Sequence, residues 1–560
     1  MSLLALFARA LLAAAIAWTV YSWTCLLLNY RSARKLGIPL RVLPISHGNP
    51  FWMLVDSRVV QLVRRLPSGD NSFTRYNWRG WEVGDRCRSH LEMGDVYMQV
   101  TPGKNWLYIC NPDALLDMFR RRSDFPRPLE IYELLNIFGP NLSTVEGNDW
   151  KKQRKITAPC FNESTNEIVW SESLSLAADM LKYWSSQKSV KTTADDIRTL
   201  SLHVLSKAGF GKSFPFQGHD LALASTNPAT SYKESLKVVL DNCVLIMALG
   251  TKFLSKPWLP RKLRRVHEAC VAFQRHMTSV YEKEKRAFAE GRSAGRNLLS
   301  SLIRASNEEA EKAASLHTGT RSSSTFTSAY TPGHDTTAHT LMFAIAFLAA
   351  NPHIQEWLAE ELRQVFGDRV DKPQEWDYQG DFPRLKRCHA VLLETVRLYT
   401  PVPVAKWTEG ATQRLRVGDD KVVTVPPDTM VIPSYAALHT HPRFWGPDAL
   451  VWRPERWIEK YEEKDRVDTE ELMTPRRGTF IPWSEGERSC PGKKFSQVEF
   501  VATIAALFND GWRVSPERMR GESDERARER LSRLIETDSA QVLLLQMLHP
   551  ERAPLVWTRR

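Results

Sequence analysis

A cysteine beside two glycines and an arginine is the residue of this chain best suited to chemistry. Residues 483–492 are Trp-Ser-Glu-Gly-Glu-Arg-Ser-Cys-Pro-Gly, and the apolar spacing that follows predicts a helix. Cys490 is therefore expected at a helix entrance, with Pro491 suited to the first helical position. Unpaired amides and the helix dipole at such an end favour a thiolate, the form that binds metals. The alternative is a surface loop with a buried, unreactive cysteine.

The residues around Cys490 suit a flat, acidic ligand. Gly486 allows a tight turn with positive φ, and Gly492 allows a ligand or another backbone to approach closely. Arg488 offers a fixed charge to an acidic group of that ligand. The remaining cysteines have neither a C-x-x-C pair nor regular spacing, so we expect reduced packing residues. They are Cys25, Cys87, Cys110, Cys160, Cys243, Cys270 and Cys388.

This segment resembles the haem-binding loop of the cytochrome P-450 family, F-x-x-G-x-R-x-C-x-G. Gly486, Arg488, Cys490 and Gly492 match the pattern, and Trp483 stands where the family usually has Phe. The resemblance implies that Cys490 is the axial ligand of haem b iron and that the other four residues contribute to binding this cofactor.

Three further motifs follow the family's order. Glu394 and Arg397 form an E-x-x-R within a helical pattern, and Arg456 lies in a P-E-R-W segment. The resemblance joins these three in a buried structural triad, although an i, i+3 surface ion pair is the ordinary alternative. Upstream, Trp150 and Arg154 match a W-x-x-x-R whose two side chains reach a haem propionate in the family.

The oxygen-activating motif of the family is matched only in part. Residues 332–337 are Pro-Gly-His-Asp-Thr-Thr, and the resemblance gives Asp335 and Thr336 the delivery of protons to bound oxygen. However, residues 315–331 include ten Ser or Thr, and Pro332 disfavours a continuing helix. The alternatives are a truncated central helix, a tolerated loop, or a translated stretch such as an unrecognised intron, which we favour. We predict a poorly ordered segment before Pro332.

The resemblance covers roughly residues 40–550 and implies a mainly α fold with small β-sheets. We expect a single large haem-binding catalytic domain, residues 51–560, with haem between two helices and no covalent attachment. Near the carboxyl end, residues 542–548 and 553–556 predict two short strands joined by a turn at 549–550.

The amino-terminal segment predicts a membrane anchor. The nineteen residues of 10–28 carry no formal charge, which is long enough to span a bilayer. We assign residues 1–30 to a transmembrane anchor and 31–50 to a hinge; a cleaved signal peptide is the alternative. More basic residues follow the segment than precede it, which predicts a single-pass protein with its catalytic domain in the cytosol. The resemblance to microsomal enzymes implies the endoplasmic reticulum as the membrane. The sequons at Asn141 and Asn162 should then carry no glycan.

Composition limits the partners. The net charge of +12 suits anionic lipid or an acidic protein, and no nucleic-acid-binding motif accompanies it. We therefore expect membrane lipid, but not nucleic acid, as a partner. The family implies NADPH-cytochrome P-450 reductase, for which Lys493 and Lys494 offer a basic surface.

The resemblance implies a monooxygenase of the fungal microsomal type that inserts one oxygen atom from O2 into a lipophilic small molecule and acts in secondary-metabolite biosynthesis. Two alternatives remain open. One is a haem-thiolate isomerase, dehydratase or peroxygenase that needs no reductase, and the other is an inactive haem protein, motivated by the segment before Pro332. The sequence does not specify the substrate.

Overall fold

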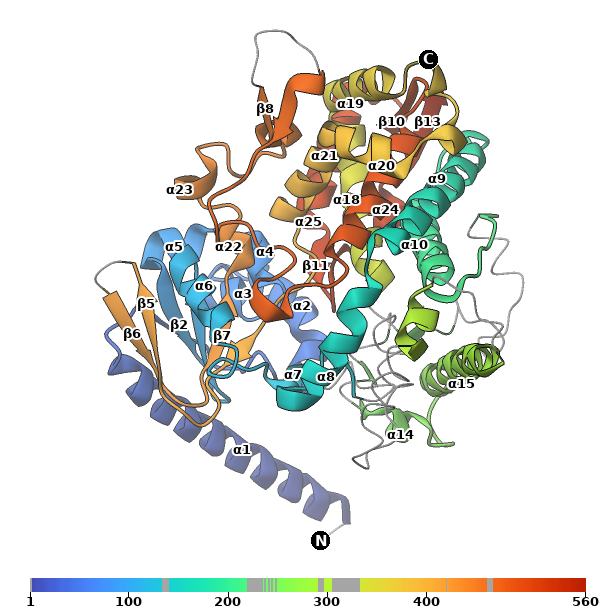
Figure 1. The fold of residues 1–560 in the computed structure, drawn as a ribbon. Coiled ribbons are helices and arrows are strands. Elements are labelled where there is room, and N and C mark those ends of the chain that lie inside the picture. Colours follow the sequence, from blue (N-terminus) through green and yellow to red (C-terminus); the bar gives the residue numbers. More distant parts are fainter. Residues whose placement is uncertain are drawn as a thin grey trace. The chain divides into compact units, whose positions relative to one another are not determined.

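The computed structural model describes most of the chain, which forms two compact units and is mostly helical with small sheets (Figure 1). The first unit comprises Met1–Ile131, Pro403–Ala449 and Arg476–Ser489, and the second comprises Tyr132–Val402, Leu450–Pro475 and Cys490–Arg560. The described residues are 3–132, 140–218, 235, 238, 239, 242, 245, 246, 249–290, 297–304, 333–418, 421–460 and 467–559. The domain limits expected from the sequence stay a prediction.

The first unit is built on a five-stranded sheet of order β1-β2-β3-β7-β4. Strands β1 and β2 are parallel, as are β3 and β7, whereas β2 with β3 and β4 with β7 are antiparallel. The strands are β1 (Leu40–Val42), β2 (Val96–Val100), β3 (Asn105–Ile109), β4 (Lys406–Trp407), β7 (Met430–Pro433) and a separate antiparallel hairpin of β5 (Gln413–Val417) and β6 (Lys421–Val425). The helices are α1 (Leu3–Arg34), α2 (Pro50–Arg64), α3 (Ser72–Tyr76), α4 (Trp81–Asp85), α5 (Arg88–Met93), α6 (Pro112–Arg120), α22 (Tyr435–Leu438), α23 (Pro442–Trp445) and the 3-10 turn η8 (Gly486–Arg488). The short helix α7 (Leu129–Tyr132) ends at the limit of this unit.

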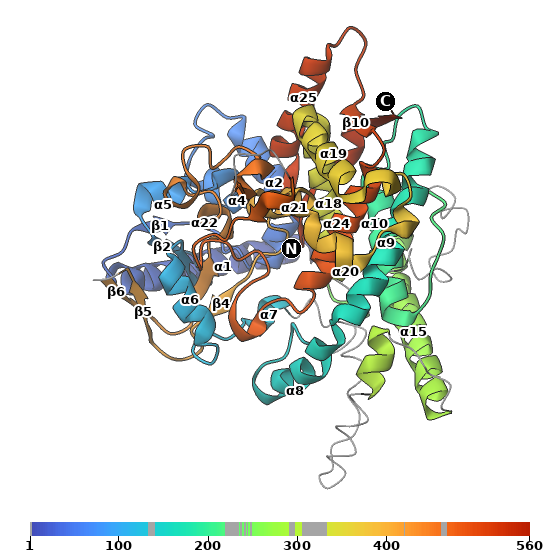
Figure 2. The ribbon, with the colours of Figure 1, turned by 45° about the horizontal axis from the view of Figure 1, so that its top comes forward.

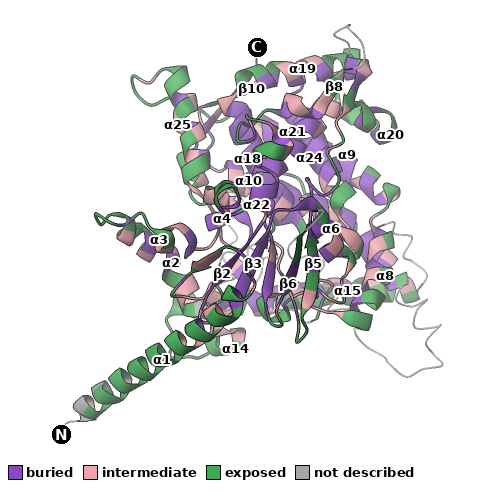
Figure 3. Cartoon of the chain, turned by 90° about the vertical axis from the view of Figure 1, so that its left-hand side faces the viewer, coloured by how far each residue is buried: buried purple, intermediate pink, exposed green. Residues whose placement is uncertain are grey.

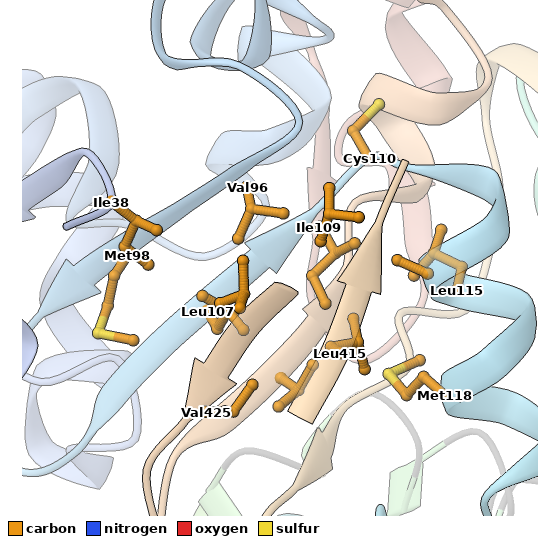
Figure 4. Close-up of a cluster of buried hydrophobic side chains, with 14 of the residues drawn as sticks. Ile38, Val96, Met98, Leu107, Ile109, Cys110, Leu115, Met118, Leu415 and Val425 are labelled. Atoms are coloured by element: carbon orange, nitrogen blue, oxygen red, sulfur yellow. The ribbon is translucent and has the colours of Figure 1, made fainter. Parts of the chain in front are cut away.

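Both faces of this sheet are covered, because β2 and β3 are buried along their whole length. Side chains of a strand alternate between faces. On one face Met98 and Leu107 join an aliphatic cluster with α6 and the β5-β6 hairpin (Figure 4). On the other face Tyr97 and Tyr108 stack with ring centroids 5.2 Å apart and join a second, aromatic cluster.

Helix α1 is exposed over most of its length (Figure 3). Its segment Leu12–Arg34 is long and apolar enough to cross a membrane. Near its carboxyl end, Leu26 and Ala33 are buried in the aliphatic cluster, and the Asn29 amide donates to the carbonyl of Thr101 at 2.9 Å. The candidate membrane helix is therefore fastened to the first unit by its last turns.

The second unit is a helical body with several short strands. Its α-helices are α8 (Gly147–Thr157), α9 (Glu163–Ser185), α10 (Thr193–Phe210), α14 (Thr251–Leu254), α15 (Arg261–Ala289), α18 (Gly333–Ala350), α19 (Pro352–Phe366), α20 (Tyr378–Asp381), α21 (Lys386–Leu398), α24 (Lys493–Leu507) and α25 (Asp524–Thr537). Its 3-10 turns are η2 (Ala158–Cys160), η3 (Gly367–Arg369), η4 (Pro373–Glu375), η5 (Phe382–Arg384), η6 (Pro454–Trp457), η7 (Val467–Thr469) and η9 (Pro550–Arg552). Its strands are β8 (Ile458–Lys460), β9 (Glu470–Leu472), β10 (Trp512–Pro516), β11 (Ser539–Gln541), β12 (Leu545–Met547) and β13 (Leu555–Arg559).

Two helices form the centre of the second unit. Every residue from 337 to 349 in α18 and from 497 to 507 in α24 is buried, as expected for helices that are apolar on all sides. Helix α18 packs against α10, α21 and α24, and α24 also packs against α9 and α21 (Figure 2). These helices position the candidate site.

The carboxyl-terminal strands differ from the sequence prediction. Strands do form at 545–547 and 555–559, but they do not pair with each other. Strand β12 pairs with β11, and β13 pairs with β10, both antiparallel. The predicted hairpin was therefore wrong, because strand pairing is decided by tertiary contacts that apolar runs alone do not reveal. Residues 315–332, for which disorder was predicted, lie outside the described residues, which resume at Gly333.

Candidate functional site

The loop before Cys490 belongs to the first unit and contains two consecutive turns. The amide of Ser484 donates to the carbonyl of Ile481 at 2.9 Å, and that of Ser489 to the carbonyl of Gly486 at 3.0 Å. Trp483 lies edge-on to Phe480, with ring centroids 6.4 Å apart. The loop thus has a fixed path before the chain enters the second unit.

Gly486 is constrained by its backbone and by close neighbours, whereas Arg488 is notable for the burial of its charge. Gly486 has a φ of +73°, and a Cβ atom there would lie 2.8 Å from the carbonyl oxygen of Phe119. Only glycine satisfies both constraints, since backbone cannot move aside as a flexible side chain can. Arg488 is 7% exposed, so its permanent charge is held close to the protein interior.

We expect Gly486→Ala to destabilise the protein by about 2 kcal/mol or more, because a left-handed backbone already costs an L-residue about 1–2 kcal/mol and the new methyl group meets a carbonyl. Thermal unfolding of the full chain in detergent would measure the loss. Gly410→Ala is the matched control: its φ is +61° but nothing lies within 4 Å of an added Cβ. Equal destabilisation by both variants would show that the contact with Phe119 does not matter.

Cys490 opens the last segment of the second unit, and its side chain is exposed. Helix α24 begins at Lys493, with Gly492 as N-cap and no side-chain capping bond. The helix thus starts two residues later than predicted, and Pro491 precedes it. A Cβ on Gly492 would lie 3.9 Å from the sulfur of Cys490 and 3.6 Å from the ring of Phe161, so the small residue keeps this corner open.

The buried cysteines have a different character. Burial raises the pKa of Cys160 and of Cys270 to about 11. Burial likewise raises the pKa of Cys87, Cys110 and Cys388. These thiols are protonated at neutral pH, as expected for packing residues.

Trp150 and Arg154 lie one turn apart on α8 of the second unit. Trp150 is 5% exposed, whereas Arg154 is half-buried. Residues four apart on a helix share one face. An indole N–H and a guanidinium therefore project from the same side of α8.

Glu394 is fully buried and forms the centre of a charge cluster in the second unit. Arg397 binds both of its carboxylate oxygens at 2.8 Å, and the Nε of Arg456 donates to Oε1 at 3.0 Å. The backbone amide of Arg453 and the indole of Trp457 add bonds of 2.8 and 2.9 Å. Helix α21 supplies two members and η6 the others, so the cluster fastens these segments together. The structure brings all three residues of the expected triad into contact.

At the start of α18, Asp335 is 3% exposed and carries an ion pair that the sequence did not reveal. Arg198 on α10 donates to both of its oxygens, with Nε–Oδ1 at 3.0 Å and Nη2–Oδ2 at 3.3 Å. Burial alone would raise the pKa of Asp335, but its interactions with His334 and with the Arg198 guanidinium outweigh burial and hold the pKa well below its usual range. Asp335 is therefore an ionised carboxylate whose orientation is fixed by Arg198.

The other polar groups of this helix end are close to Asp335. The Nε2 of His334 lies 3.4 Å from Oδ1 of Asp335, and burial lowers its pKa. Burial also lowers the pKa of His339, one turn further along, to about 4, so it is neutral at neutral pH. The hydroxyl of Thr336 donates to the carbonyl of Gly333 at 3.1 Å.

Sequence reasoning missed Arg198, the indole of Trp457 and a buried carboxylic acid, Glu499. Only Glu499 left a signal, since it is a charged residue within the apolar run of α24. Of the predicted site residues, Trp483, Gly486 and Arg488 belong to the first unit, and the others to the second.

Comparison with known proteins gives consistent matches. The family model described as cytochrome P-450 matches residues 85–536. A cytochrome P-450 monooxygenase of Arthrobotrys oligospora is 27% identical over 519 residues, covering 86% of this chain and 87% of the relative. A monooxygenase of the phomenoic acid biosynthesis cluster of Leptosphaeria maculans is 28% identical, covering 88% and 89%. Cytochrome P-450 monooxygenase 124 of Postia placenta is 29% identical, covering 81% and 83%.

Proposed function

Because this chain belongs to the cytochrome P-450 family of monooxygenases, we propose that it uses haem b, bound through Cys490, to insert one oxygen atom from O2 into a lipophilic small molecule. Family membership makes the protein an oxidoreductase and implies haem as its cofactor. We propose three further points: that the haem is haem b, which residues hold it, and which reaction it carries out.

The exposure of Cys490 carries this proposal. A metal-binding cysteine has to be deprotonated and accessible. Among the described cysteines Cys490 is the exposed one. It lies beside the uncapped amino terminus of α24, where amide groups favour negative charge. The raised pKa values of the buried cysteines oppose ligation by any of them.

The residues near Cys490 and on α8 fit a flat, acidic macrocycle. Gly492 leaves space beside the sulfur that a larger side chain would fill. Arg488 and Arg154 are suited to carboxylate groups, because a guanidinium binds them with two parallel hydrogen bonds. Trp150 adds an indole N–H donor. We assign Trp483 and Gly486 to shaping the loop. The residues assigned to direct contact with haem are Cys490, Gly492, Arg488, Trp150 and Arg154.

Asp335 and Thr336 are assigned to the oxygen side of the haem. The ion pair with Arg198 fixes the orientation of the Asp335 carboxylate and keeps it ionised. In that state it accepts hydrogen bonds and orients a water molecule or the Thr336 hydroxyl, which is the group able to donate a proton. Both residues therefore position protons rather than bind substrate.

When haem is bound, its chemistry is the activation of O2. The electrons for this activation originate from NADPH. The family normally receives these electrons from a reductase, and we propose NADPH-cytochrome P-450 reductase as the partner. Lys493 and Lys494 are exposed at the start of α24, and the Lys494 ammonium lies 4.4 Å from the ring centroid of Phe382. We propose both lysines as candidates for a reductase contact.

The position of the sequons supports our assignment of a cytosolic domain anchored in the endoplasmic reticulum by α1. Asn141 is 2% exposed. Asn162 caps α9: its Oδ1 accepts from the amide of Thr165 at 3.0 Å, and its Nδ2 donates to the carbonyl of Pro159 at 3.2 Å. The burial of Asn141 leaves no room for a glycan on its side chain in the folded protein, which fits a compartment without glycosylation.

The relatives favour secondary metabolism as the setting. The Leptosphaeria relative belongs to a phomenoic acid biosynthesis cluster, and a more distant relative in Ganoderma lucidum is named ganoderic acid synthetase. We therefore propose a lipophilic secondary metabolite or its precursor as substrate.

The ferrous carbon-monoxide spectrum of the purified full chain tests this proposal. We expect the absorption of a thiolate-ligated haem and oxygenation that depends on both NADPH and reductase. A spectrum typical of an imidazole-ligated haem would refute ligation by Cys490. A correct spectrum with products that form without NADPH would instead favour an isomerase, dehydratase or peroxygenase.

A further inference from the structure

A buried tyrosine of the second unit has a carboxylate bonded to its hydroxyl. Tyr378 on α20 is 6% exposed, and its hydroxyl donates to Oε2 of Glu163, the first residue of α9, at 2.5 Å. The other carboxylate oxygen of Glu163 accepts from the amide of Asn166 at 3.4 Å. Burial and the Glu163 carboxylate raise the pKa of Tyr378, so the phenol is protonated at neutral pH. Its proton leaves only in a reaction that makes the phenol more acidic, such as the loss of an electron.

Tyr378 belongs to a buried aromatic group that we call the α9–α20 cluster. The ring centroid of Trp170 lies 6.2 Å from that of Tyr378 and 6.0 Å from that of Phe382, and the last two are 5.5 Å apart. No member is more than 7% exposed, and the members are Trp170, Phe366, Trp376, Tyr378 and Phe382. Of these side chains, tryptophan and tyrosine are the kinds that lose an electron readily.

The indoles of the cluster differ from Tyr378 in what accepts their proton. The indole N–H of Trp170 donates to the backbone carbonyl of Trp376 at 3.1 Å, and that of Trp376 donates to the carbonyl of Arg369 at 2.7 Å. A backbone carbonyl accepts a hydrogen bond but is too weak a base to take the proton, whereas a carboxylate acts as a base. Tyr378 is therefore the member of the cluster that can lose an electron and a proton together.

The α9–α20 cluster lies against the start of α24, the helix that follows Cys490. Both α9 and η5 pack against α24. The ring of Phe161 would lie 3.6 Å from a Cβ on Gly492, and Phe161 precedes Glu163 by two residues. Two residues span at most about 7 Å of chain. The backbone of Glu163 is therefore close to the corner at which Cys490 is proposed to bind iron.

We propose that Tyr378 is a redox-active tyrosine, which gives an electron to the haem site when hydrogen peroxide oxidises this site in the absence of substrate. This inference rests on the proposed function, because a thiolate-bound haem is the oxidant that it requires. When Tyr378 reacts, its O–H bond breaks. The electron leaves towards the haem, the proton goes to Glu163, and a neutral tyrosyl radical remains. Tyr378 thereby removes oxidising equivalents that would otherwise damage the haem and its surroundings.

The electrons and protons of this reaction balance. Reduction of one hydrogen peroxide to two waters takes two electrons from the haem site and two protons from solvent. Tyr378 returns one of these electrons, and Glu163, which is exposed, releases the accepted proton to solvent. A small thiol then supplies one electron and one proton to the tyrosyl radical, and two such thiols end as a disulfide.

Electron paramagnetic resonance of the full-chain holoenzyme, frozen rapidly after mixing with hydrogen peroxide, tests the site. We expect a tyrosyl radical signal that Tyr378→Phe abolishes, since this substitution removes only the hydroxyl. Tyr108→Phe is the matched control, because Tyr108 is also buried and also interacts with a carboxyl group, Glu82, but belongs to the first unit. A signal that survives Tyr378→Phe, or that disappears in folded Tyr108→Phe, overturns the proposal.

Glu163→Gln tests the proton acceptor. The amide oxygen still accepts the hydrogen bond but does not take the proton, so we expect the tyrosyl signal to be replaced by that of a tryptophan radical. Trapping with a nitrone, followed by peptide mass spectrometry, should locate the adduct at Tyr378 in the wild type and at Trp170 in this variant. An unchanged tyrosyl signal in Glu163→Gln would mean that the carboxylate is not the acceptor, and the proposed step fails.

Two further measurements separate this inference from the proposed function. If the wild-type carbon-monoxide spectrum is not that of a thiolate-ligated haem, the proposed function fails and removes the oxidant. A normal spectrum without an adduct at Tyr378 defeats only the redox role of this tyrosine. Haem absorbance should decay faster under peroxide in Tyr378→Phe than in the wild type, and equal decay rates would contradict the protective role.

Discussion

Cys490→Ser is expected to lose the carbon-monoxide spectrum of a thiolate-ligated haem and all NADPH-dependent oxygenation. A serine hydroxyl stays protonated at neutral pH and is a poor ligand for haem iron, so the strong electron donation of the thiolate is lost. The substitution is nearly isosteric, and the side chain is exposed. We therefore expect a folded protein that is inactive.

Cys160→Ser provides the control for this experiment. Cys160 is buried in the same unit, burial raises its pKa to about 11, and its thiol donates to the carbonyl of Ile156 at 3.3 Å, a bond that serine can keep. This variant should retain the spectrum and the activity. A thiolate spectrum that survives Cys490→Ser would mean that a different cysteine binds the iron.

The sequence was most informative where residues of special type stand at fixed spacing. The helical pattern around Glu394 and Arg397 corresponds to α21, and the mainly helical fold with small sheets is confirmed. Loop residues such as Gly486 were identified because a turn of positive φ leaves few alternatives to glycine. Such constraints are local, so the sequence displays them directly.

The contacts that join distant segments could not be predicted in this way. Arg198 precedes Asp335 by more than a hundred residues, and no pattern in α10 marks it as the partner of that carboxylate. The predicted pairing of the carboxyl-terminal strands failed for the same reason, since β12 and β13 each found another partner. Glu499 shows a further limit: its complete burial follows from the packing of other helices against α24, which the sequence does not display.

The cluster around Glu394 leads to the second large expected effect, which concerns stability. In Glu394→Gln one of two acceptor positions becomes an NH2 group that faces N–H donors, whichever way the amide turns. In the wild-type protein, Oε1 of Glu394 accepts hydrogen bonds from Arg397, Arg456 and the Arg453 amide, and Oε2 accepts from Arg397 and Trp457. Because two guanidinium charges then stay buried without a counter-charge, we expect a loss of about 3–5 kcal/mol.

Such a loss is a large part of the roughly 5–15 kcal/mol that keeps a typical protein folded. Denaturant unfolding of the full chain in detergent, together with haem retention, would measure it. Glu455→Gln is the control in η6, the turn that supplies Arg456 and Trp457, because the Glu455 side chain is 37% exposed and its ion-pair neighbour His353 is 3.9 Å away and 69% exposed. Solvent screens such a pair, so this variant should remain close to the wild type. If Glu394→Gln were equally stable, the cluster would contribute no more than a surface ion pair, and its burial would need a different explanation.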